Sequence, residues 1–272
     1  VAAKASTVAR LPEKVTLDEV YARITEPLLS GVVPFGLAET ALPESPLVTA
    51  CIDFVENPHA VATGTQESGL ATWLRAMMLG IMRTYTHEEA TIILIDPRKK
   101  NVGVVPEDTW LAAYAQNPAH IHAVIKDLCV ILDERQAPPT ASQTELATKR
   151  FWEGRELFVV VDQITSWTNT GNPLAQLAPY IEPGESLGLH IVATADVGQW
   201  GYQAQAGVVL SKVTNMRPPI LVLNGHRQHG PIVPGVYAEP QRQGKGMLVT
   251  RRGTDGVLVG WSEPPVLARA RR

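Results

Sequence analysis

Apolar residues follow two different periods along this chain. Several short runs are almost wholly apolar and end at Asp, Asn, Pro or Gly, which is typical of strands buried on both faces in a parallel sheet. We predict such strands at residues 33–39, 46–54, 60–63, 90–97, 156–163, 188–196 and 218–225. Residues 246–261 hold two further β runs around Gly253-Thr254-Asp255-Gly256, and this pattern predicts a hairpin near the end of the chain.

Other stretches repeat their apolar side chains at the spacing of a helix. We predict helices within residues 16–29, 70–82, 117–135, 142–154 and 172–182. Two of them begin with a capping-box pair, Thr16 with Glu19 and Ser142 with Glu145. Residues 117–135 open with Asn117-Pro118, where a helix start is expected.

The alternation of strands and helices predicts an α/β fold. Right-handed crossovers between successive strands give a mostly parallel central sheet flanked by helices on both faces, with the hairpin at its C-terminal end. Neither an internal repeat nor a low-complexity linker divides the sequence. We therefore expect one domain over residues 1–272, with residues 1–14 as a leader arm and residues 265–272 as a basic tail.

Composition narrows the class of protein. The chain has 272 residues, of which 45% are hydrophobic and 19% charged, as in globular α/β proteins. A net charge of −3 gives no electrostatic footprint for nucleic acid, and no apolar run is long enough to cross a bilayer. Because the sequence lacks an initiator methionine, we expect a fragment of a longer polypeptide.

The most informative local pattern is HAVATGTQESGLATWLRAMM, residues 59–78. Gly64 and Gly69 have the spacing of a phosphate-binding P-loop, between a strand and a helix. Leu70 and Ala71 stand where that motif has a lysine and a hydroxyl residue. A second interpretation stays open, in which the two glycines serve the backbone alone. If nucleotide binds, the residues that hold it are Gly64, Thr65, Gln66, Glu67, Ser68, Gly69, Leu70, Ala71 and Thr72.

The missing residues bear on chemistry more than on shape. A P-loop binds phosphate through main-chain N–H groups at a helix N-terminus, which any tolerated side chain leaves in place. The lysine adds a cation on the phosphates and the hydroxyl holds Mg²⁺. Leu70 has no charge and Ala71 no oxygen. We therefore expect binding of ATP and Mg²⁺ to be weak at most, with little or no hydrolysis and no catalytic residue in this half of the site.

A second motif is ELFVVVDQ, in which Asp162 follows an apolar strand as the Mg²⁺-binding carboxylate of a Walker B motif does, acting through water. An alternative role for Asp162 is to cap the turn at the strand end. Gln163 is neutral where many such ATPases carry a carboxylate that orients the attacking water. Thr194 is a weaker candidate for a sensor of the γ-phosphate. Arg98 is a candidate arginine finger, although a solvated loop is the favoured interpretation for it.

Together these segments, with the phrase NPLAQLAPYIEPGESLGLHIVATAD at residues 172–196, resemble the FtsK/SpoIIIE-type ATPase domains of EccC motors from type VII (ESX) secretion systems. The resemblance covers nearly the whole chain and is strongest to the last, C-terminal domain of such motors. It implies a RecA/FtsK-like P-loop NTPase fold. This chain departs from the full motif at Leu70, Ala71 and Gln163, which puts hydrolysis in doubt.

The resemblance also implies a function. We expect a degenerate ATPase domain that lies in the cytoplasm at the inner face of the membrane, reaching the membrane only through the rest of the complex. Its expected partners are the other ATPase domains of the motor and dimers of secreted ESX-type substrates, recruited by a C-terminal signal. Two alternatives stay open: an active or ATP-binding ATPase that powers protein translocation, and a structural spacer.

Overall fold

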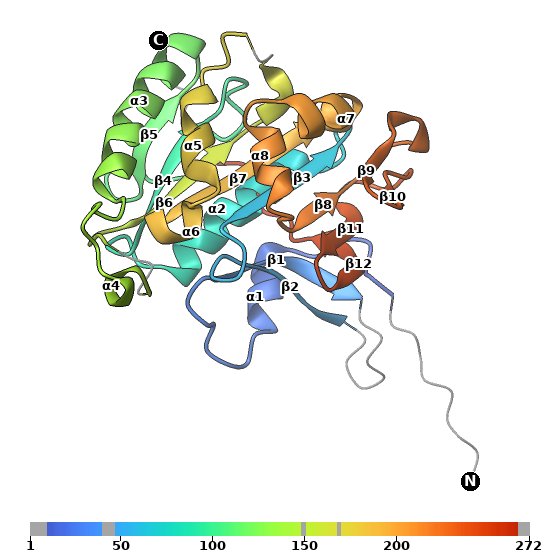
Figure 1. The fold of residues 1–272 in the computed structure, drawn as a ribbon. Coiled ribbons are helices and arrows are strands. Elements are labelled where there is room, and N and C mark those ends of the chain that lie inside the picture. Colours follow the sequence, from blue (N-terminus) through green and yellow to red (C-terminus); the bar gives the residue numbers. More distant parts are fainter. Residues whose placement is uncertain (1–9, 40–46, 148–150, 168–169, 266–272) are drawn as a thin grey trace, which may run out of the picture.

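A twisted sheet forms the centre of the molecule, which was analysed as a computed structural model (Figure 1). The structure describes residues 10–39, 47–147, 151–167 and 170–265. Most of the expected leader arm, residues 1–9, and nearly all of the expected basic tail, residues 266–272, lie outside the described residues. The first described segment packs onto the protein, since Leu11 and Val15 are buried against Val20, Leu37 and Leu258.

Ten strands of the described chain join one sheet in the order β2-β1-β12-β11-β8-β3-β7-β6-β4-β5. Their bounds, from one edge to the other, are Leu47–Asp53, Val32–Glu39, Gly253–Val259, Lys245–Thr250, Ile220–Val222, His59–Gly64, Leu189–Asp196, Glu156–Val161, Ala90–Ile95 and Leu111–Ala115. The strands from β8 to β5 run parallel, and the other pairs are antiparallel. A small separate sheet pairs β9 (Pro231–Val233) with β10 (Val236–Tyr237).

The predicted hairpin is confirmed as β11 and β12, and it lies inside the sheet. Its two strands join the parallel strands to the β1–β2 pair, because β11 bonds to β8 and β12 bonds to β1. Figure 1 shows β1, β2 and the short helix α1 (Leu17–Ala22) grouped below the parallel strands. The hairpin therefore connects β1 with β8, two strands that are far apart in the sequence.

Helices cover both faces of the sheet. On one face α2 (Leu70–Thr84) buries Trp73, Met77 and Met78 in a core shared with β1 and β4. On the other face a second core lies beneath α3, α5, α6, α7 and α8, whose bounds are Pro118–Glu134, Ala178–Ile181, Gly184–Leu187, Val197–Ala206 and Leu210–Asn215. The remaining short elements are α4 (Gln143–Ala147) and the 3₁₀ turns Ile164–Ser166, Ala175–Leu177 and Arg227–His229. None of the helices in the described ranges is long and apolar enough to span a membrane.

Two predicted helices that begin with a capping box are shorter than their sequence pattern, and the helix predicted within residues 172–182 is reduced to the 3₁₀ turn Ala175–Leu177 followed by α5. The helix predicted within residues 16–29 begins at its capping box and ends at Ala22, because Pro27 cannot continue a helix and disfavours the helical conformation of the residue before it. The helix predicted within residues 142–154 keeps its capping box and is described over Gln143–Ala147; residues 148–150 lie outside the described residues, and residues 151–154 are not helical. Both prediction errors concern length, since each helix starts where its cap predicts.

The strand register brings the candidate site together. Gly64 pairs with Asp196, Val161 pairs with both Ile95 and Ala193, and all four strands run in the same direction. Their carboxyl ends therefore share one edge of the sheet, where ligands bind in open α/β sheets. The loops that follow these strands carry the P-loop-like segment, Arg98 and Asp162.

Candidate functional site

The P-loop-like segment has the strand, loop and helix arrangement that the sequence predicts. β3 ends at Gly64 and α2 begins at Leu70, at the carboxyl edge of the sheet. Glu67 has φ +62° and Gly69 has φ +112°, so left-handed residues occur within the loop. Such alternation turns successive N–H groups toward one concave side, which is the geometry of an anion-binding nest.

Main-chain donors remain available in this loop. The N–H groups of Gln66, Glu67 and Gly69 donate to no acceptor among the described residues. Thr65 is tied down, because its N–H donates to the Asn224 carbonyl oxygen at 2.9 Å and its hydroxyl accepts from the Asn224 amide at 2.9 Å. The loop therefore has three N–H groups without an acceptor, and its first residue, Thr65, is held in place by Asn224.

Both glycines also have a steric reason for being there. A Cβ on Gly69 would lie 2.8 Å from the nitrogen of Gly244, whose N–H donates to the Ser68 carbonyl oxygen at 2.8 Å. A Cβ on Gly64 would lie 2.6 Å from the Ser68 hydroxyl oxygen. The two interpretations of the glycine pair are thus compatible, since the backbone requires both residues whether or not an anion binds.

Asp162 is engaged by Arg98 in an arrangement that the sequence did not predict. The Arg98 Nε donates to Asp162 Oδ2 at 2.7 Å and its Nη2 donates to Oδ1 at 2.6 Å. Asp162 is fully buried and the Arg98 side chain is 32% exposed. These bonds raise the pKa of Arg98, and the pair is a bidentate one of the kind that is strong in proteins. Arg98 does lie in an exposed loop, as the favoured interpretation has it, but its guanidinium is paired with Asp162. Its role as an arginine finger stays a prediction.

The loop that delivers Arg98 is organised by Asp96, at the end of β4. The Asp96 carboxylate accepts from the N–H groups of Lys100 at 3.1 Å and Asn101 at 2.7 Å. Burial raises the pKa of Asp96, against the lowering effect of these two bonds. Lys99 takes a left-handed conformation with φ +56° inside this turn. The Arg98 guanidinium is thus carried by a well-bonded turn.

Thr194 and Gln163 complete the surroundings of Asp162. The Thr194 hydroxyl donates to Asp162 Oδ1 at 3.2 Å and accepts from the Gln163 N–H at 2.8 Å. Thr194 therefore lies beside the candidate Walker B carboxylate, as a polar sensor residue would. Its role as a γ-phosphate sensor stays a prediction. The Thr194 hydroxyl is already hydrogen-bonded to both Asp162 and Gln163.

The space between these groups is small. A pocket of about 180 Å³, here called the loop pocket, is lined by Thr65, Gln66, Glu67, Gly69, Leu70, Ala71, Thr72, Arg98, Lys100, Gln163 and Gln243. Ligand pockets usually measure about 300–1,000 Å³. The loop pocket thus brings together seven of the nine predicted nucleotide-binding residues, while Gly64 and Ser68 lie buried beneath it.

The donor set of the loop pocket does not fit Mg²⁺-ATP. The phosphate position lacks the lysine and the hydroxyl, Glu67 adds a carboxylate, and the oxygens of Asp162 are held by Arg98. The assignment of Asp162 as a water-mediated Mg²⁺ ligand stays a prediction. No cluster of three or more His, Cys, Asp or Glu side chains in the described chain is arranged to hold a metal.

Comparison with known proteins agrees with the fold. The sequence profile of the FtsK/SpoIIIE family matches residues 41–199. The ESX-4 secretion system protein EccC4 of Mycobacterium tuberculosis is 30% identical over 263 residues, which cover 96% of this chain and 21% of the relative. The ESX secretion system protein EccC of Thermomonospora curvata is 29% identical over 85% of this chain and 17% of the relative. The chain spans about a fifth of the length of these curated relatives.

Solved structures give the same result. The structure of ATPases 2 and 3 of T. curvata EccC in complex with a signal sequence peptide superposes with a TM-score of 0.84 at 26% identity, over 94% of this chain and 44% of that one. The cytoplasmic domain of the T. curvata type VII secretion ATPase EccC gives 0.83 at 26% identity, over 94% and 29%. The mostly parallel sheet, the loop at its carboxyl edge and the sequence profile lead to one conclusion: the chain belongs to the FtsK/SpoIIIE family.

Proposed function

We propose that this chain is a degenerate ATPase domain of a type VII secretion motor, which recruits secreted substrates by their C-terminal signal and regulates the motor. Two things support the proposal: the similarity to EccC proteins and the signal sequence peptide bound in the related T. curvata structure. Its place would be in the cytoplasm at the inner face of the membrane. Its partners would be the other ATPase domains of the motor and dimeric secreted substrates.

The observation that carries the proposal is the pairing of Arg98 with Asp162. An ATPase needs the Walker B carboxylate to hold Mg²⁺ through water, and in this chain that carboxylate is neutralised from within. The charge that a metal would balance is already balanced by a guanidinium. With Leu70 and Ala71 at the phosphate position as well, the loop lacks the lysine and the hydroxyl that stabilise a transferring phosphoryl group in a P-loop.

Without hydrolysis, the contribution of the domain to the motor is a coupling between sites. A docked substrate tail that binds one arrangement of the tandem domains more tightly shifts the population toward that arrangement. The size of the shift equals the difference in affinity of the tail for the two arrangements. Regulation of this kind needs binding of the tail and no hydrolysis.

Phosphate release and peptide binding, measured on the full 272-residue chain, test the proposal together. We expect phosphate release to be the same for the chain and for its Asp162→Asn variant, because any release that both preparations share comes from a contaminating ATPase. We also expect a tail peptide of a secreted substrate to bind. Hydrolysis that Asp162→Asn abolishes would establish the active ATPase instead. A chain that releases no phosphate and binds neither Mg-ATP nor any tail peptide would be a structural spacer.

A second candidate, nucleotide binding without turnover, is favoured by one feature. The free amides of the loop and the cations Arg98 and Lys100 face the same pocket. Calorimetric titration with ATP in the presence and absence of Mg²⁺ separates this candidate from an ordinary ATPase site. ATP binding that does not depend on Mg²⁺ and releases no phosphate supports this candidate, and the absence of any ATP binding contradicts it.

A further inference from the structure

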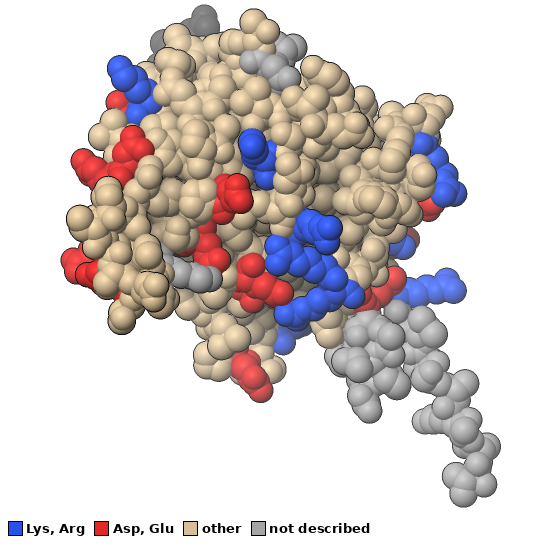
Figure 2. Space-filling view, viewed as in Figure 1, with Lys and Arg blue, Asp and Glu red and all other residues tan. Residues whose placement is uncertain are grey.

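Arg75, on the second turn of α2, is one of two Lys or Arg side chains that are buried in the described part of the chain, and only 6% of its surface is exposed. The other, Arg135, donates to two main-chain oxygens and lies over the ring of Trp152. Elsewhere such side chains reach the surface, where Figure 2 shows several of them next to Asp and Glu. A buried guanidinium is costly unless its charge and its N–H groups are compensated, so the partners of Arg75 are informative.

The partner that Arg75 has does not balance its charge. Its Nη1 donates to the main-chain oxygen of Ser262 at 3.0 Å, and a carbonyl oxygen carries no net charge. No carboxylate of the described residues lies within 4.0 Å of the guanidinium. Burial lowers the pKa of Arg75, and no neighbouring charge opposes that effect. Within the described chain, the guanidinium is therefore a buried cation without a counter-charge.

One edge of this guanidinium also lacks hydrogen-bond partners among the described residues. The Arg75 Nε is fully enclosed and donates to nothing, and the enclosed hydroxyl of Ser262 has no partner either. The Arg75 Nη2 makes no hydrogen bond but keeps some contact with solvent. Buried polar atoms nearly always have a partner in proteins, so two orphaned atoms on adjoining residues indicate an ion or a water that completes the site.

Arg98 shows what the same edge does when it is occupied. The Arg98 Nε and Nη2 donate to the two oxygens of Asp162. In Arg75 the same two nitrogens have no acceptor in the described chain, although its guanidinium is the more deeply buried of the two. The edge that binds a carboxylate in one arginine is therefore available for a ligand in the other.

The donors at this edge define the chemistry of the ligand. Two parallel N–H groups of a guanidinium match two oxygens of a phosphate, sulfate or carboxylate group. A water molecule would satisfy the Arg75 Nε and the Ser262 hydroxyl but would leave the positive charge unbalanced. An oxyanion satisfies both the hydrogen bonds and the charge.

We propose that Arg75 and Ser262 form a binding site for one small oxyanion, with inorganic phosphate as the representative ligand. Its oxygens accept from Nε and Nη2 of Arg75 and from the Ser262 hydroxyl. The ligand enters on the side where Nη2 meets solvent, and Ser262 moves aside to uncover Nε. Ser262 is only half-buried and is followed by the exposed residues Glu263 and Pro264, so it lies in a segment at the surface.

The site is separate from the loop pocket. Arg75 does not line that pocket and lies one helical turn beyond Ala71 and Thr72, which do. The inference therefore does not depend on the proposed function of the domain, and it assigns a ligand to a part of α2 that the P-loop-like segment does not use.

A bound oxyanion would fasten α2 to the segment around Trp261. The Trp261 N–H donates to the Val15 oxygen at 2.8 Å, and the Lys14 ammonium lies 3.7 Å from the centre of the Trp261 ring. Ser262, the next residue, is already bonded to Arg75. Occupancy of the site is therefore expected to stabilise the folded chain against unfolding.

The test is thermal unfolding of the full 272-residue chain at constant pH and ionic strength, with chloride replaced stepwise by phosphate. We expect a saturable rise in the unfolding midpoint of at least about 2 °C, because a ligand that binds only the folded chain stabilises it. Phosphate also stabilises proteins in general, since it is excluded from their surface. That effect does not saturate and is shared by every variant.

Arg75→Met is the central variant, because methionine fills much of the same space without a charge. In chloride it should unfold at the midpoint of the parent or above it, since removing an uncompensated buried cation relieves a desolvation cost. In phosphate it should lack the saturable rise. Arg75→Lys keeps the charge but has no fork of parallel donors, and it should raise the half-saturating phosphate concentration at least about tenfold.

Arg83→Met is the matched control. Arg83 lies about two turns further along α2, where its guanidinium pairs with Asp18 at the surface. This variant should keep the saturable rise in full. Retention of the rise in Arg83→Met and its loss in Arg75→Met together support the site.

Three results would overturn the proposal. The first is a parent chain without a saturable rise. The second is an Arg75→Met variant whose midpoint falls by the same amount in chloride and in phosphate, because the bond to Ser262 would then be purely structural. The third is a rise that Lys100→Gln removes and Arg75→Met keeps, which would place the anion in the loop pocket. Substrate recruitment is tested separately by peptide binding, so these results leave the proposed function as it stands.

Discussion

The Arg98 guanidinium donates two hydrogen bonds, of 2.7 and 2.6 Å, to the Asp162 carboxylate, which directly follows β6 beside the loop pocket. A second arginine pair, Arg83 with Asp18, has the same 2.6 Å contact but lies at the surface, where the Asp18 side chain is 84% exposed. The two pairs differ in burial and in the number of hydrogen bonds, since Arg83 donates one bond to Asp18 and Arg98 donates two to Asp162. They therefore allow the energetic role of the buried pair to be measured against an exposed reference.

Arg98→Ala should lower the free energy of unfolding by about 3 kcal/mol, because it leaves the buried Asp162 charge without a partner. Adding Asp162→Asn to the Arg98→Ala variant should recover a large part of this loss, because the asparagine amide carries no charge that would be left without a partner. Urea unfolding of the two single variants and the double variant gives the coupling energy. Arg83→Ala is the control and should cost less than about 1 kcal/mol. Equal losses for Arg98→Ala and Arg83→Ala would show that the buried pair contributes no more to stability than the exposed one.

Restoring the P-loop side chains should not by itself restore Mg-ATP binding. Leu70→Lys/Ala71→Thr supplies the cation and the hydroxyl, but Arg98 still occupies the Asp162 oxygens. We expect calorimetry to detect Mg-dependent ATP binding only when Arg98→Ala is added to this pair of changes. Because Leu70 is largely buried, thermal unfolding should accompany each titration. Mg-dependent binding by the double variant with Arg98 intact would contradict the blocking role of Arg98.

Gly69→Ala should destabilise the chain more than an ordinary glycine replacement. The new methyl group meets the Gly244 backbone at 2.8 Å, and the residue is left in a left-handed conformation. Strain and overpacking together predict a loss of about 3 kcal/mol. Gly235→Ala is the matched control, because Gly235 has φ +82° but nothing within 4 Å of the added carbon. It should cost about 1–2 kcal/mol in the same denaturant titration. If Gly69→Ala and Gly235→Ala lowered the free energy of unfolding equally, the contact with Gly244 would contribute nothing to the loss.

Stability should fall between pH 7 and pH 5 because of His59. Burial lowers the pKa of His59 to about 4 from its ordinary 6.5. Its Nδ1 accepts from the Ile191 N–H at 3.0 Å and its Nε2 contacts the Ile181 oxygen at 2.8 Å, an arrangement that requires the neutral ring. The unfolded chain takes up the proton first, so the stabilisation is complete above pH 6.5 and is lost as the pH falls toward 4. The loss from pH 7 to 5 should be about 2 kcal/mol.

His59→Gln checks this assignment. A glutamine does not titrate, so the difference in unfolding free energy between pH 7 and pH 5 should shrink by about 2 kcal/mol in the variant. A parent chain with the same stability at both pH values would exclude a buried neutral His59.

Much of the fold was predictable because its strongest signals are local. Strands β4, β6 and β7 are continuous apolar runs, and their ends at Asp96, Asp162 and Asp196 are visible in the sequence. The capping pairs Thr16/Glu19 and Ser142/Glu145 mark helix starts that the structure confirms. The position of the P-loop-like segment at the carboxyl edge follows from parallel strand order.

The elements that sequence analysis missed have weak local signals. α7 contains Gly198 and Gly201, which disfavour helix, and it forms under a cap from Asp196 with Trp200 buried beneath it. β5 is a short run, LAAYA, with little β propensity, and it forms because β4 offers an edge to pair with. In both cases tertiary contacts decide the outcome, and a sequence pattern does not contain them.

The Arg98 pairing was missed for a related reason. Arg98 and Asp162 are 64 residues apart, and each has several reasonable roles when its sequence neighbourhood is considered alone. One signal was available: both residues closely follow predicted parallel strands, and such strand ends meet at one edge of the sheet. That reasoning places the two loops together but does not say which side chains pair.

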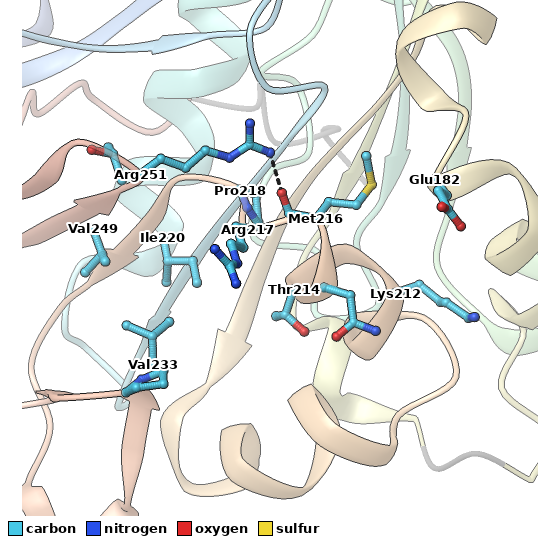
Figure 3. Close-up of a pocket in the computed structure, with 13 residues that line it drawn as sticks. Glu182, Lys212, Thr214, Met216, Arg217, Pro218, Ile220, Val233, Val249 and Arg251 are labelled. Carbon is cyan, nitrogen blue, oxygen red and sulfur yellow. Dashed lines mark hydrogen bonds between the residues drawn. The ribbon is translucent and has the colours of Figure 1, made fainter.

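One short strand has a further consequence. β8 contains three residues and spans about 10 Å. At one end Ile220 lines a cavity of about 1280 Å³ at the amino ends of the parallel strands (Figure 3), and just beyond the other end Leu223 donates to the Thr63 oxygen and Asn224 bonds to Thr65. The neighbouring strand β11 makes a second connection, because Gln243 just before it lines the loop pocket and Val249 within it lines the larger cavity. A shift of either strand along its axis would therefore change the shape of both cavities.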